Sequence, residues 1–201
     1  MIRVLVADDQ HLVRGALAAL LALEDDIEVV GQIGSGDQLV AEARRTGPDV
    51  ALVDIEMPGL DGLAATAELR AALPGCRVLI LTTFGRPGYL RRAMESGASG
   101  FMVKDAPAAE LAEAVRRVSR GLRVVDPVLA AESLATGTNP LTSREREVLL
   151  AARSGGTVGD VARAVMLGEG TVRNYLSAAI GKTGARTRAE AVRTAEERGW
   201  L

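Results

Sequence analysis

Short apolar stretches alternate with amphipathic stretches through about the first 120 residues, and this alternation constrains the fold more than any other feature. The apolar stretches predict five strands, at Ile2–Ala7, Ile27–Ile33, Val50–Val53, Val78–Thr82 and Gly100–Val103. Helical periodicity follows each of them, near residues 11–23, 36–46, 61–73, 87–96 and 107–120. Alternating strands and helices predict an α/β fold with a doubly wound parallel sheet, in the flavodoxin-like strand order 2-1-3-4-5.

After Pro140 the strand pattern ends and only helical patterns remain. Thr142 stands at an N-cap position, with Leu141 before it and Glu145 at the capping-box position. Three further helices are predicted near residues 157–165, 169–182 and 187–198. We therefore predict an α/β domain at residues 1–121, a linker at 122–140 with a short helix over Val128–Leu134, and an all-α four-helix domain at 141–201.

Charge is distributed unevenly between these parts. Residues 1–121 carry 13 Lys and Arg against 17 Asp and Glu, a net of -4, whereas residues 139–201 carry 10 against 7, a net of +3. A basic C-terminal part favours a nucleic-acid partner. No apolar run approaches the roughly 20 residues of a membrane span, so we expect a cytoplasmic protein without membrane insertion. The only cysteine, Cys76, excludes a disulfide framework and is interpreted as an incidental thiol.

Carboxylates follow two strands that this strand order places side by side. Asp8 and Asp9 follow the first strand, and Asp54 ends the third. Ligands of open α/β sheets bind beyond the carboxyl ends of the strands, and three crowded carboxylates repel one another unless a cation joins them. Asp9 and Asp54 could share one octahedral Mg²⁺, with Asp8 holding metal-bound water.

Two further polar residues, Thr82 and Lys104, follow the next two strands at the same edge. A carboxylate attacks an anionic phosphoryl group only where the approaching charge is neutralised, here by the metal and by the Lys104 ammonium. The Thr82 hydroxyl could then bind an oxygen of the new phosphoryl group. Because the metal, Lys104 and Thr82 would surround Asp54, we predict that Asp54 accepts a phosphoryl group. Taken singly, each of these residues is more commonly a helix cap or a surface charge. The single histidine, His11, is interpreted as exposed rather than as a metal ligand.

The helix predicted at residues 169–182 has two different sides. Its apolar stripe consists of Val172, Leu176, Ala179, Ile180 and Thr183. Its opposite side holds Asn174, Ser177, Ala178 and Gly181, flanked by Arg173 and Lys182. Such a helix suits a DNA major groove, where Arg reads guanine and Asn reads adenine, with the preceding helix as scaffold. Periodicity alone favours the alternative, a solvated face of an ordinary bundle.

The motifs of the first 120 residues resemble those of bacterial response-regulator receiver domains. They are Asp8-Asp9, Asp54 with Met57-Pro58-Gly59, Leu81-Thr82-Thr83, and Gly97–Lys104. The resemblance implies Asp54 as phosphoacceptor, and Mg²⁺ held by Asp9, Asp54 and the backbone carbonyl of Glu56. It also implies Thr82 and Phe101 as switch residues that move together, and Lys104 as a phosphate contact.

The C-terminal part resembles LuxR-type helix-turn-helix domains at Leu141–Leu149, Gly170–Arg173 and Ala189–Ala191. A receiver followed by such a domain resembles the NarL/FixJ group of two-component response regulators, and several stretches are similar to its DesR-type members. This implies a sensor histidine kinase, double-stranded promoter DNA and a homodimer formed on phosphorylation, with a fatty-acid desaturase gene as target. It implies Arg173, Asn174 and Ser177 as base-edge contacts, and Thr171 and Lys182 as phosphate contacts.

Departures from the LuxR-type pattern weaken the expected binding of a monomer. Gly159 stands where a basic residue usually opens the scaffold helix, Gly155-Gly156 loosens the preceding turn, and Thr183 replaces a usual leucine. We therefore expect dimeric binding to paired half-sites. Two alternatives are an enzyme, a phosphatase with an aspartyl-phosphate intermediate, and a receiver with a protein-interaction module. We expect a regulator rather than an enzyme, because Asp54 ends the third strand and no substrate-binding cap is evident.

Overall fold

The structure is a computed structural model that describes residues 1–83, 87–127, 129–131 and 139–201. These residues form two compact units, which are described separately. The predicted linker helix Val128–Leu134 lies largely outside the described residues, although residues 129–131 are helical. Residues Phe84–Arg86, part of the Thr82–Tyr89 stretch that is similar to DesR-type members, also lie outside them.

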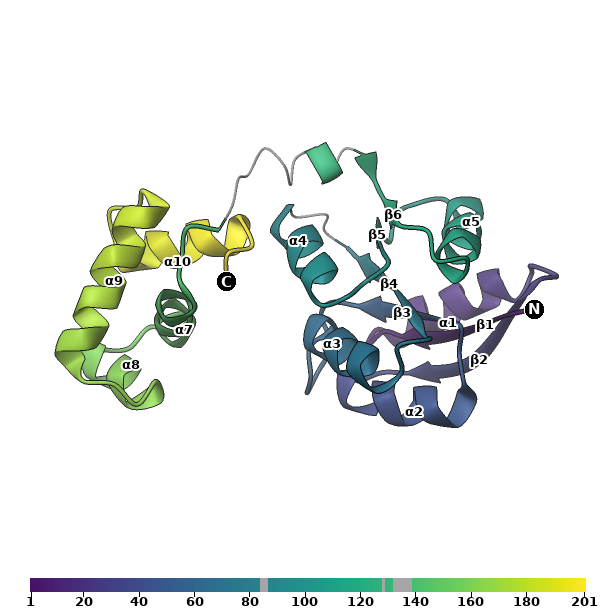
Figure 1. Ribbon diagram of the computed structural model, residues 1–201, viewed down its shortest axis with the longest axis horizontal. Coiled ribbons are helices and arrows are strands. Elements are labelled where there is room, and N and C mark those ends of the chain that lie inside the picture. The colour runs from purple at the N-terminus through teal and green to yellow at the C-terminus, as the bar shows by residue number, and fades with distance from the viewer. Residues whose placement is uncertain (84–86, 128, 132–138) are drawn as a thin grey trace. The chain divides into compact units, whose positions relative to one another are not determined.

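The N-terminal unit is built on a six-stranded parallel sheet in the order β2-β1-β3-β4-β5-β6 (Figure 1). The strands are β1 (Ile2–Ala7), β2 (Ile27–Ile33), β3 (Val50–Asp54), β4 (Arg77–Thr82), β5 (Gly100–Val103) and β6 (Val124–Val125). The predicted fold and the order of its first five strands are confirmed. The central strand β3 is buried at every residue, as expected for a sheet with helices on both faces.

Helices alternate with these strands. They are α1 (His11–Leu21), α2 (Leu39–Thr46, after the 3-10 turn Gly36–Gln38), α3 (Gly62–Ala72), α4 (Pro87–Glu95) and α5 (Ala108–Ser119). One core cluster joins Leu21 of α1 and Val115 of α5 to side chains from one face of the sheet, such as Leu52. Figure 1 shows α2 and α3 on the opposite face, so alternate strand residues are buried by different helices.

The sheet extends beyond the predicted end of the domain. Val124 and Val125 lie in the stretch predicted as linker, yet they form β6 and pair in parallel with Gly100 and Phe101 of β5. Two residues are too few for a strand pattern to be recognisable in the sequence. The rest of the predicted domain boundaries stays a prediction.

The C-terminal unit contains four helices among the described residues: α7 (Ser143–Ala151), α8 (Val158–Ala164), α9 (Glu169–Thr183) and α10 (Arg188–Glu197). The capping box predicted at Thr142 and Glu145 is present, and a second one at Thr157 and Asp160 begins α8. Their small core includes Val148, Val161, Val172 and Trp200. The predicted all-α domain is therefore confirmed.

Candidate functional site

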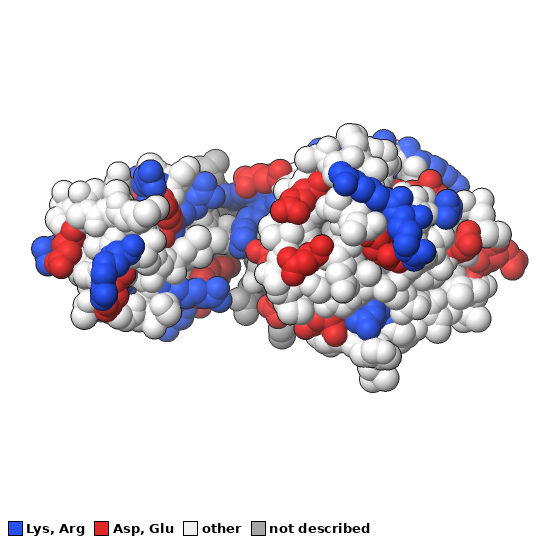
Figure 2. All heavy atoms as spheres, turned by 90° about the horizontal axis from the view of Figure 1, so that it is seen from below, with Lys and Arg blue, Asp and Glu red and all other residues white. Residues whose placement is uncertain are grey.

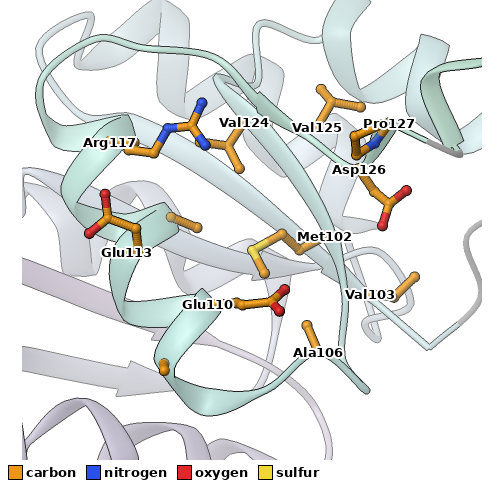
Figure 3. Close-up of a pocket in the computed structure, with 12 residues that line it drawn as sticks. Met102, Val103, Ala106, Glu110, Glu113, Arg117, Val124, Val125, Asp126 and Pro127 are labelled. Atoms are coloured by element: carbon orange, nitrogen blue, oxygen red, sulfur yellow. The ribbon is translucent and has the colours of Figure 1, made fainter.

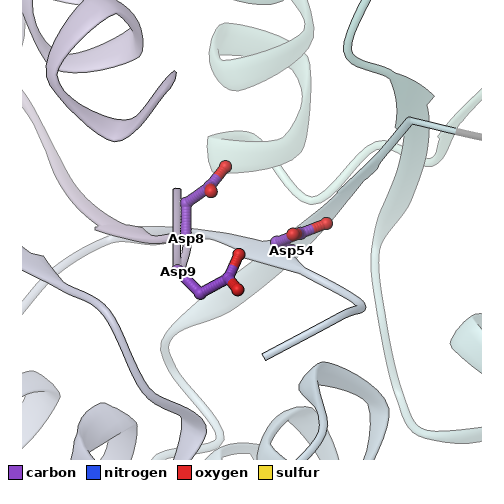
Figure 4. A group of neighbouring side chains, drawn as sticks. All are labelled: Asp8, Asp9 and Asp54. Carbon is purple, nitrogen blue, oxygen red and sulfur yellow. The ribbon is translucent and has the colours of Figure 1, made fainter. Parts of the chain in front are cut away.

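Three carboxylates meet at the carboxyl edge of the sheet. β1 and β3 pair side by side, with Ala7 opposite Val53, so Asp8 and Asp54 emerge together. One oxygen from each of Asp8, Asp9 and Asp54 lies within 4.8 Å of the others (Figure 4). Asp8 and Asp54 are buried, at 1% and 4% exposure, whereas Asp9 is exposed. The cluster is thus closed on the protein side and open to solvent at Asp9.

The ammonium group of Lys104 bridges the two buried carboxylates. Its Nζ lies 2.8 Å from Asp8 Oδ2 and 2.9 Å from Asp54 Oδ2, and its side chain is 8% exposed. Backbone groups bind the other oxygens: the Gln10 N–H donates to Asp8 Oδ1 at 2.9 Å, and the Ile55 N–H donates to Asp54 Oδ1 at 2.8 Å. The predicted proximity of these side chains is present, while their chemical roles remain predictions.

The electrostatics of this cluster favour an additional cation. Burial raises the pKa of the Asp54 carboxyl, and Asp8 raises it further, against the opposing effect of Lys104. Burial alone would lower the pKa of Lys104, but its hydrogen bonds to Asp8 and Asp54 outweigh burial and raise it. Three carboxylates against one ammonium leave two uncompensated negative charges when all are ionised. An all-oxygen set with this excess charge fits a hard divalent cation such as Mg²⁺.

The loop after Asp54 is fixed by a glycine that the sequence did not single out. The Gly62 N–H donates to the Ile55 carbonyl at 2.9 Å, and a Cβ at Gly62 would lie 1.8 Å from the Asp54 carbonyl oxygen. Asp61 caps α3 by accepting from the Leu63 and Ala64 N–H groups. The Asp61-Gly62 pair is a recognisable N-cap signal, but the close approach to Asp54 depends on the fold.

The other predicted receiver residues occupy three different environments. Thr82 ends β4 and is 4% exposed, and its carbonyl accepts from the Lys104 N–H at 2.7 Å. Phe101 is fully buried on β5, three residues before Lys104. The Glu56 side chain is exposed in the loop after β3. Arg14 of α1, which sequence reasoning missed, donates a hydrogen bond to the Asp8 carbonyl.

Two residues that the sequence set aside behave as expected of structural positions. His11 is exposed at the first residue of α1. Cys76 is buried, and its burial raises the pKa of the thiol to about 11. A thiol with that pKa is almost wholly protonated at neutral pH and is a poor nucleophile.

The two predicted sides of α9 are present in the C-terminal unit. Val172, Leu176, Ala179 and Thr183 are buried, and Ile180 is partly buried. The predicted DNA-contacting residues are all exposed: Thr171, Arg173, Asn174, Ser177 and Lys182. Ala178 and Gly181 are exposed as well, so a backbone or base edge could approach α9 closely on that side.

The two basic side chains of this helix have different partners. Arg173 Nη2 lies 2.7 Å from Glu169 Oε2 in a pair whose side chains are 63% and 54% exposed. Lys182 Nζ lies 2.8 Å from Oε2 of Glu145, whose side chain is only 6% exposed. An exposed pair contributes about 0–1 kcal/mol and is easily exchanged for a DNA contact. Lys182 instead neutralises a buried carboxylate of the α7 capping box, a structural role that the sequence did not reveal.

Charges of both signs are mixed on the surface of the C-terminal unit. On the face drawn in Figure 2, red and blue side chains lie side by side in this unit. Arg144, Arg163 and Arg173 each pair with an acidic residue three or four positions away. These three arginines therefore lie beside acidic side chains, so much of the positive charge of this unit is paired locally. Among the described residues, no helix has the length and apolar character that crossing a membrane requires.

Comparison with known proteins gives matches for both units. Residues 4–116 match the response regulator receiver domain, and residues 139–195 match the luxR family of bacterial regulatory proteins. The chain is 44% identical over 201 residues to the transcriptional regulatory protein DesR of Bacillus subtilis, with 100% of both chains covered. It is 39% identical to the response regulator RamR of Streptomyces coelicolor, with 100% of this chain and 98% of that protein covered.

Solved structures show the same architecture. The response regulator ChrA of a heme-sensing two-component system matches with a TM-score of 0.59 and 32% identity, over 100% of this chain and 98% of that one. An RcsB–DNA complex matches with a TM-score of 0.69 over 98% of both chains, but at 21% identity it shows the fold alone.

Proposed function

This chain belongs to the two-component response regulators with a LuxR-type DNA-binding domain, and on that premise we propose that phosphorylation of Asp54 controls its binding to DNA. The observation that carries the proposal is the position of Asp54, buried beside two further carboxylates and in contact with Lys104.

We propose Mg²⁺ as the ion of the acidic cluster. Asp9 and Asp54 would bind it directly, with Asp8 through water and the Glu56 backbone carbonyl as a further ligand. The exposed Asp9 gives the ion a path from solvent. When bound, the ion would neutralise charge on the phosphoryl oxygens.

In the transfer step, a carboxylate oxygen of Asp54 would form a bond to the phosphorus of a phosphohistidine on the sensor kinase. The phosphorus–nitrogen bond breaks, and the leaving imidazole nitrogen takes up a proton. Lys104 would hold the phosphoryl oxygens after leaving its ion pair with Asp54. The Thr82 hydroxyl would bind another of these oxygens, and the resulting movement of Thr82 would be transmitted to Phe101.

Intact mass after treatment with acetyl phosphate and Mg²⁺ tests the acceptor. The protein should gain one phosphoryl group, Asp54→Ala should gain none, and Asp25→Ala, which removes an exposed carboxylate, should behave as the wild type. Equal phosphorylation of Asp54→Ala would refute the assignment. Continuous turnover of a small phosphomonoester would instead support the phosphatase alternative.

The exposed side of α1 is a candidate surface for the homodimer. Leu12 and Leu20 of α1 and Leu23, in the turn just after it, are 86%, 41% and 79% exposed, and Leu12 and Leu20 share one side of the helix with the exposed residues Ala16 and Ala19. An apolar stripe of this kind on a soluble domain favours association. Leu12→Asp should keep the phosphorylated protein monomeric in sedimentation. Dimerisation of this variant at wild-type strength would exclude the α1 surface.

We propose that the exposed side of α9 enters the major groove of promoter DNA. Arg173 and Asn174 would read base edges with Ser177, while Thr171 and Lys182 would contact phosphates. Arg173→Ala should weaken specific binding by about 1–3 kcal/mol in a mobility-shift assay, because one bidentate base contact is lost. Glu169→Ala removes only its exposed partner and should not weaken binding. Unchanged binding in Arg173→Ala would exclude Arg173 as a base contact, and an absence of DNA binding by the wild type would favour the protein-interaction module.

The most specific proposal concerns the gene that the protein regulates. The resemblance to DesR-type regulators, together with 44% identity to a protein of that name, favours a membrane-lipid desaturase gene. DNA binding and a partner kinase with a cytoplasmic phosphohistidine both require a cytoplasmic location. Mapping the genomic sites bound by the phosphorylated protein tests the target, and the absence of a desaturase promoter among them would remove it.

A further inference from the structure

A cavity of about 370 Å³ lies between α5 and the edge of the sheet formed by β5 and β6. It is separate from the acidic cluster and forms because the short strand β6 continues the sheet beside α5. Figure 3 shows Met102 of β5 in its centre, with Glu110 and Glu113 on the α5 side and Asp126 across from them. Its volume lies within the range of about 300–1,000 Å³ that is usual for small-molecule sites.

The floor of this cavity is apolar. Met102 and Ala114 are 8% and 3% exposed, and Val124 and Val125 of β6 are partly buried beside them. Methionine adapts its shape readily and makes favourable contacts with aromatic rings. The floor therefore suits an aromatic or alicyclic group, and its size is too small for a helix of a partner protein.

The rim of the cavity is predominantly acidic. Glu110 and Glu113 are exposed one helical turn apart on α5, and Asp126 follows β6. Arg117 is the one basic residue among the lining residues. Among the described residues, neither Glu110 nor Glu113 forms a salt bridge, and Arg116, three positions after Glu113, pairs with Glu24 and Asp26 instead. Three carboxylates against one guanidinium give the rim a net negative charge around an apolar floor.

We propose that this cavity is a binding site for a small organic cation with an aromatic or alicyclic body, such as a primary arylalkylamine. The apolar body occupies the floor at Met102, and the ammonium group is bound by Glu110 and Glu113. Charge complementarity selects the cation, because an anion of the same shape would face the net negative rim.

Such a ligand would also touch the segment that carries Lys104. Val103 and Ala106 line the cavity on either side of Lys104 and Asp105 in the sequence. If phosphorylation of Asp54 shifts Lys104, it also shifts one wall of the cavity. Binding and phosphorylation would then influence each other equally, as thermodynamic linkage requires. This second step rests on the proposed function, whereas the binding site itself does not.

Methyl NMR of the full chain tests the site. With ¹³C-methyl methionine and phenethylamine as probe, the Met102 signal, assigned by its loss in Met102→Leu, should shift to saturation with a Kd on the order of 1 mM. The double variant Glu110→Gln/Glu113→Gln should weaken binding about fivefold or more. Glu68→Gln, which removes an exposed carboxylate on α3, should leave it unchanged. Hydrocinnamate, an anion of similar shape, should not bind.

Three results would overturn the site: no movement of the Met102 signal, equal binding of hydrocinnamate, or unchanged affinity in the double glutamate variant. Beryllofluoride, which mimics the phosphoryl group, tests the coupling separately. The Kd for phenethylamine should change at least about threefold in the wild type and not in Asp54→Ala. An unchanged Kd would overturn the coupling. The acetyl phosphate experiment shows independently whether Asp54 accepts a phosphoryl group.

Discussion

At the scale of single residues, the positive charge of Lys104 compensates the negative charges of two buried carboxylates at the edge of the sheet. Its ammonium contacts both Asp8 and Asp54 within 3 Å, and all three side chains are almost fully buried. Removing one partner of a buried ion pair is strongly destabilising, because it leaves an uncompensated charge in a poorly solvated place. Lys104 thus stabilises the resting site as well as serving the proposed chemistry.

Replacing Lys104 by methionine should therefore lower the free energy of unfolding by about 2–4 kcal/mol at neutral pH. Urea unfolding in the presence of a chelator measures this loss without interference from a bound cation. Arg117→Met removes an exposed positive charge and should change stability by less than about 0.5 kcal/mol. Adding Asp8→Asn to Lys104→Met should recover part of the loss. Equal stability of the two single variants would contradict the role given to Lys104.

The positions of Asp8, Asp9, Asp54 and Lys104 could be predicted because carboxyl ends of adjacent parallel strands meet at one edge. The sequence could not show that Gly62 must lack a Cβ beside the Asp54 carbonyl, or that Arg14 binds the Asp8 carbonyl. In both cases a residue of a helix approaches a backbone carbonyl at the end of a strand, and this approach depends on how the helices pack on the sheet. Residue types at strand ends are readable from sequence, whereas close backbone approaches are not.

At the scale of elements, the ion pair between Lys182 and Glu145 joins α9 to the start of α7. Burial alone would raise the pKa of Glu145, but the hydrogen bonds from Lys182 and Thr142 outweigh it and lower the pKa below its ordinary value of 4.5. The folded state therefore holds the proton more weakly than the unfolded state. The resulting stability is present above about pH 4.5 and is lost as the pH falls through the lower folded pKa.

Lys182→Gln should reduce stability by about 1 kcal/mol at pH 7, because the half-exposed lysine leaves Glu145 without its cation. The difference from the wild type should shrink as the pH falls below 4.5, where Glu145 becomes protonated in the variant. Thermal unfolding across this pH window measures it. Arg173→Gln, which breaks an exposed pair, is the control and should show little difference at any pH. A loss in Lys182→Gln that is independent of pH would exclude the ion pair as its cause.

The turn between α8 and α9 contains a residue in an unfavourable backbone conformation. Met166 has a φ of 54° and is 90% exposed. Non-glycine residues other than Asn and Asp rarely adopt this left-handed region. This conformation could not be predicted from the sequence, because glycine or asparagine would be the usual residue at such a turn.

Met166→Asn should stabilise the C-terminal unit by about 0.5–1 kcal/mol, because asparagine tolerates the left-handed region without the added chain entropy of glycine. Thermal unfolding of the full chain, followed by the fluorescence of its single tryptophan, Trp200, measures the change. Met94→Asn makes the same substitution within the helix α4, where no left-handed backbone is required. It is the control and should not raise the stability of the protein. A lower melting temperature for Met166→Asn would contradict this interpretation.

At the scale of the whole molecule, an acidic receiver domain with a proposed phosphorylation site is joined to a basic helical domain whose exposed helix α9 is proposed to read DNA. The alternation of strands and helices predicted the first domain, and the loss of that alternation after Pro140 predicted the second. The two-residue strand β6 and the cavity beside it could not be predicted, because neither leaves a periodic pattern in the sequence. The family matches give both domains, whereas the proposed link between phosphorylation and DNA binding would be a property of the intact chain.

The affinity of the full chain for a DNA fragment from one of its genomic sites, with and without beryllofluoride, tests this link most directly. We predict at least about tenfold tighter binding by the beryllofluoride-treated wild type, within the usual range of coupling energies of 1–3 kcal/mol. Asp25→Ala should keep this response and Asp54→Ala should lose it. Equal affinity of the treated and untreated wild type, or the same strengthening in Asp54→Ala, would contradict the account.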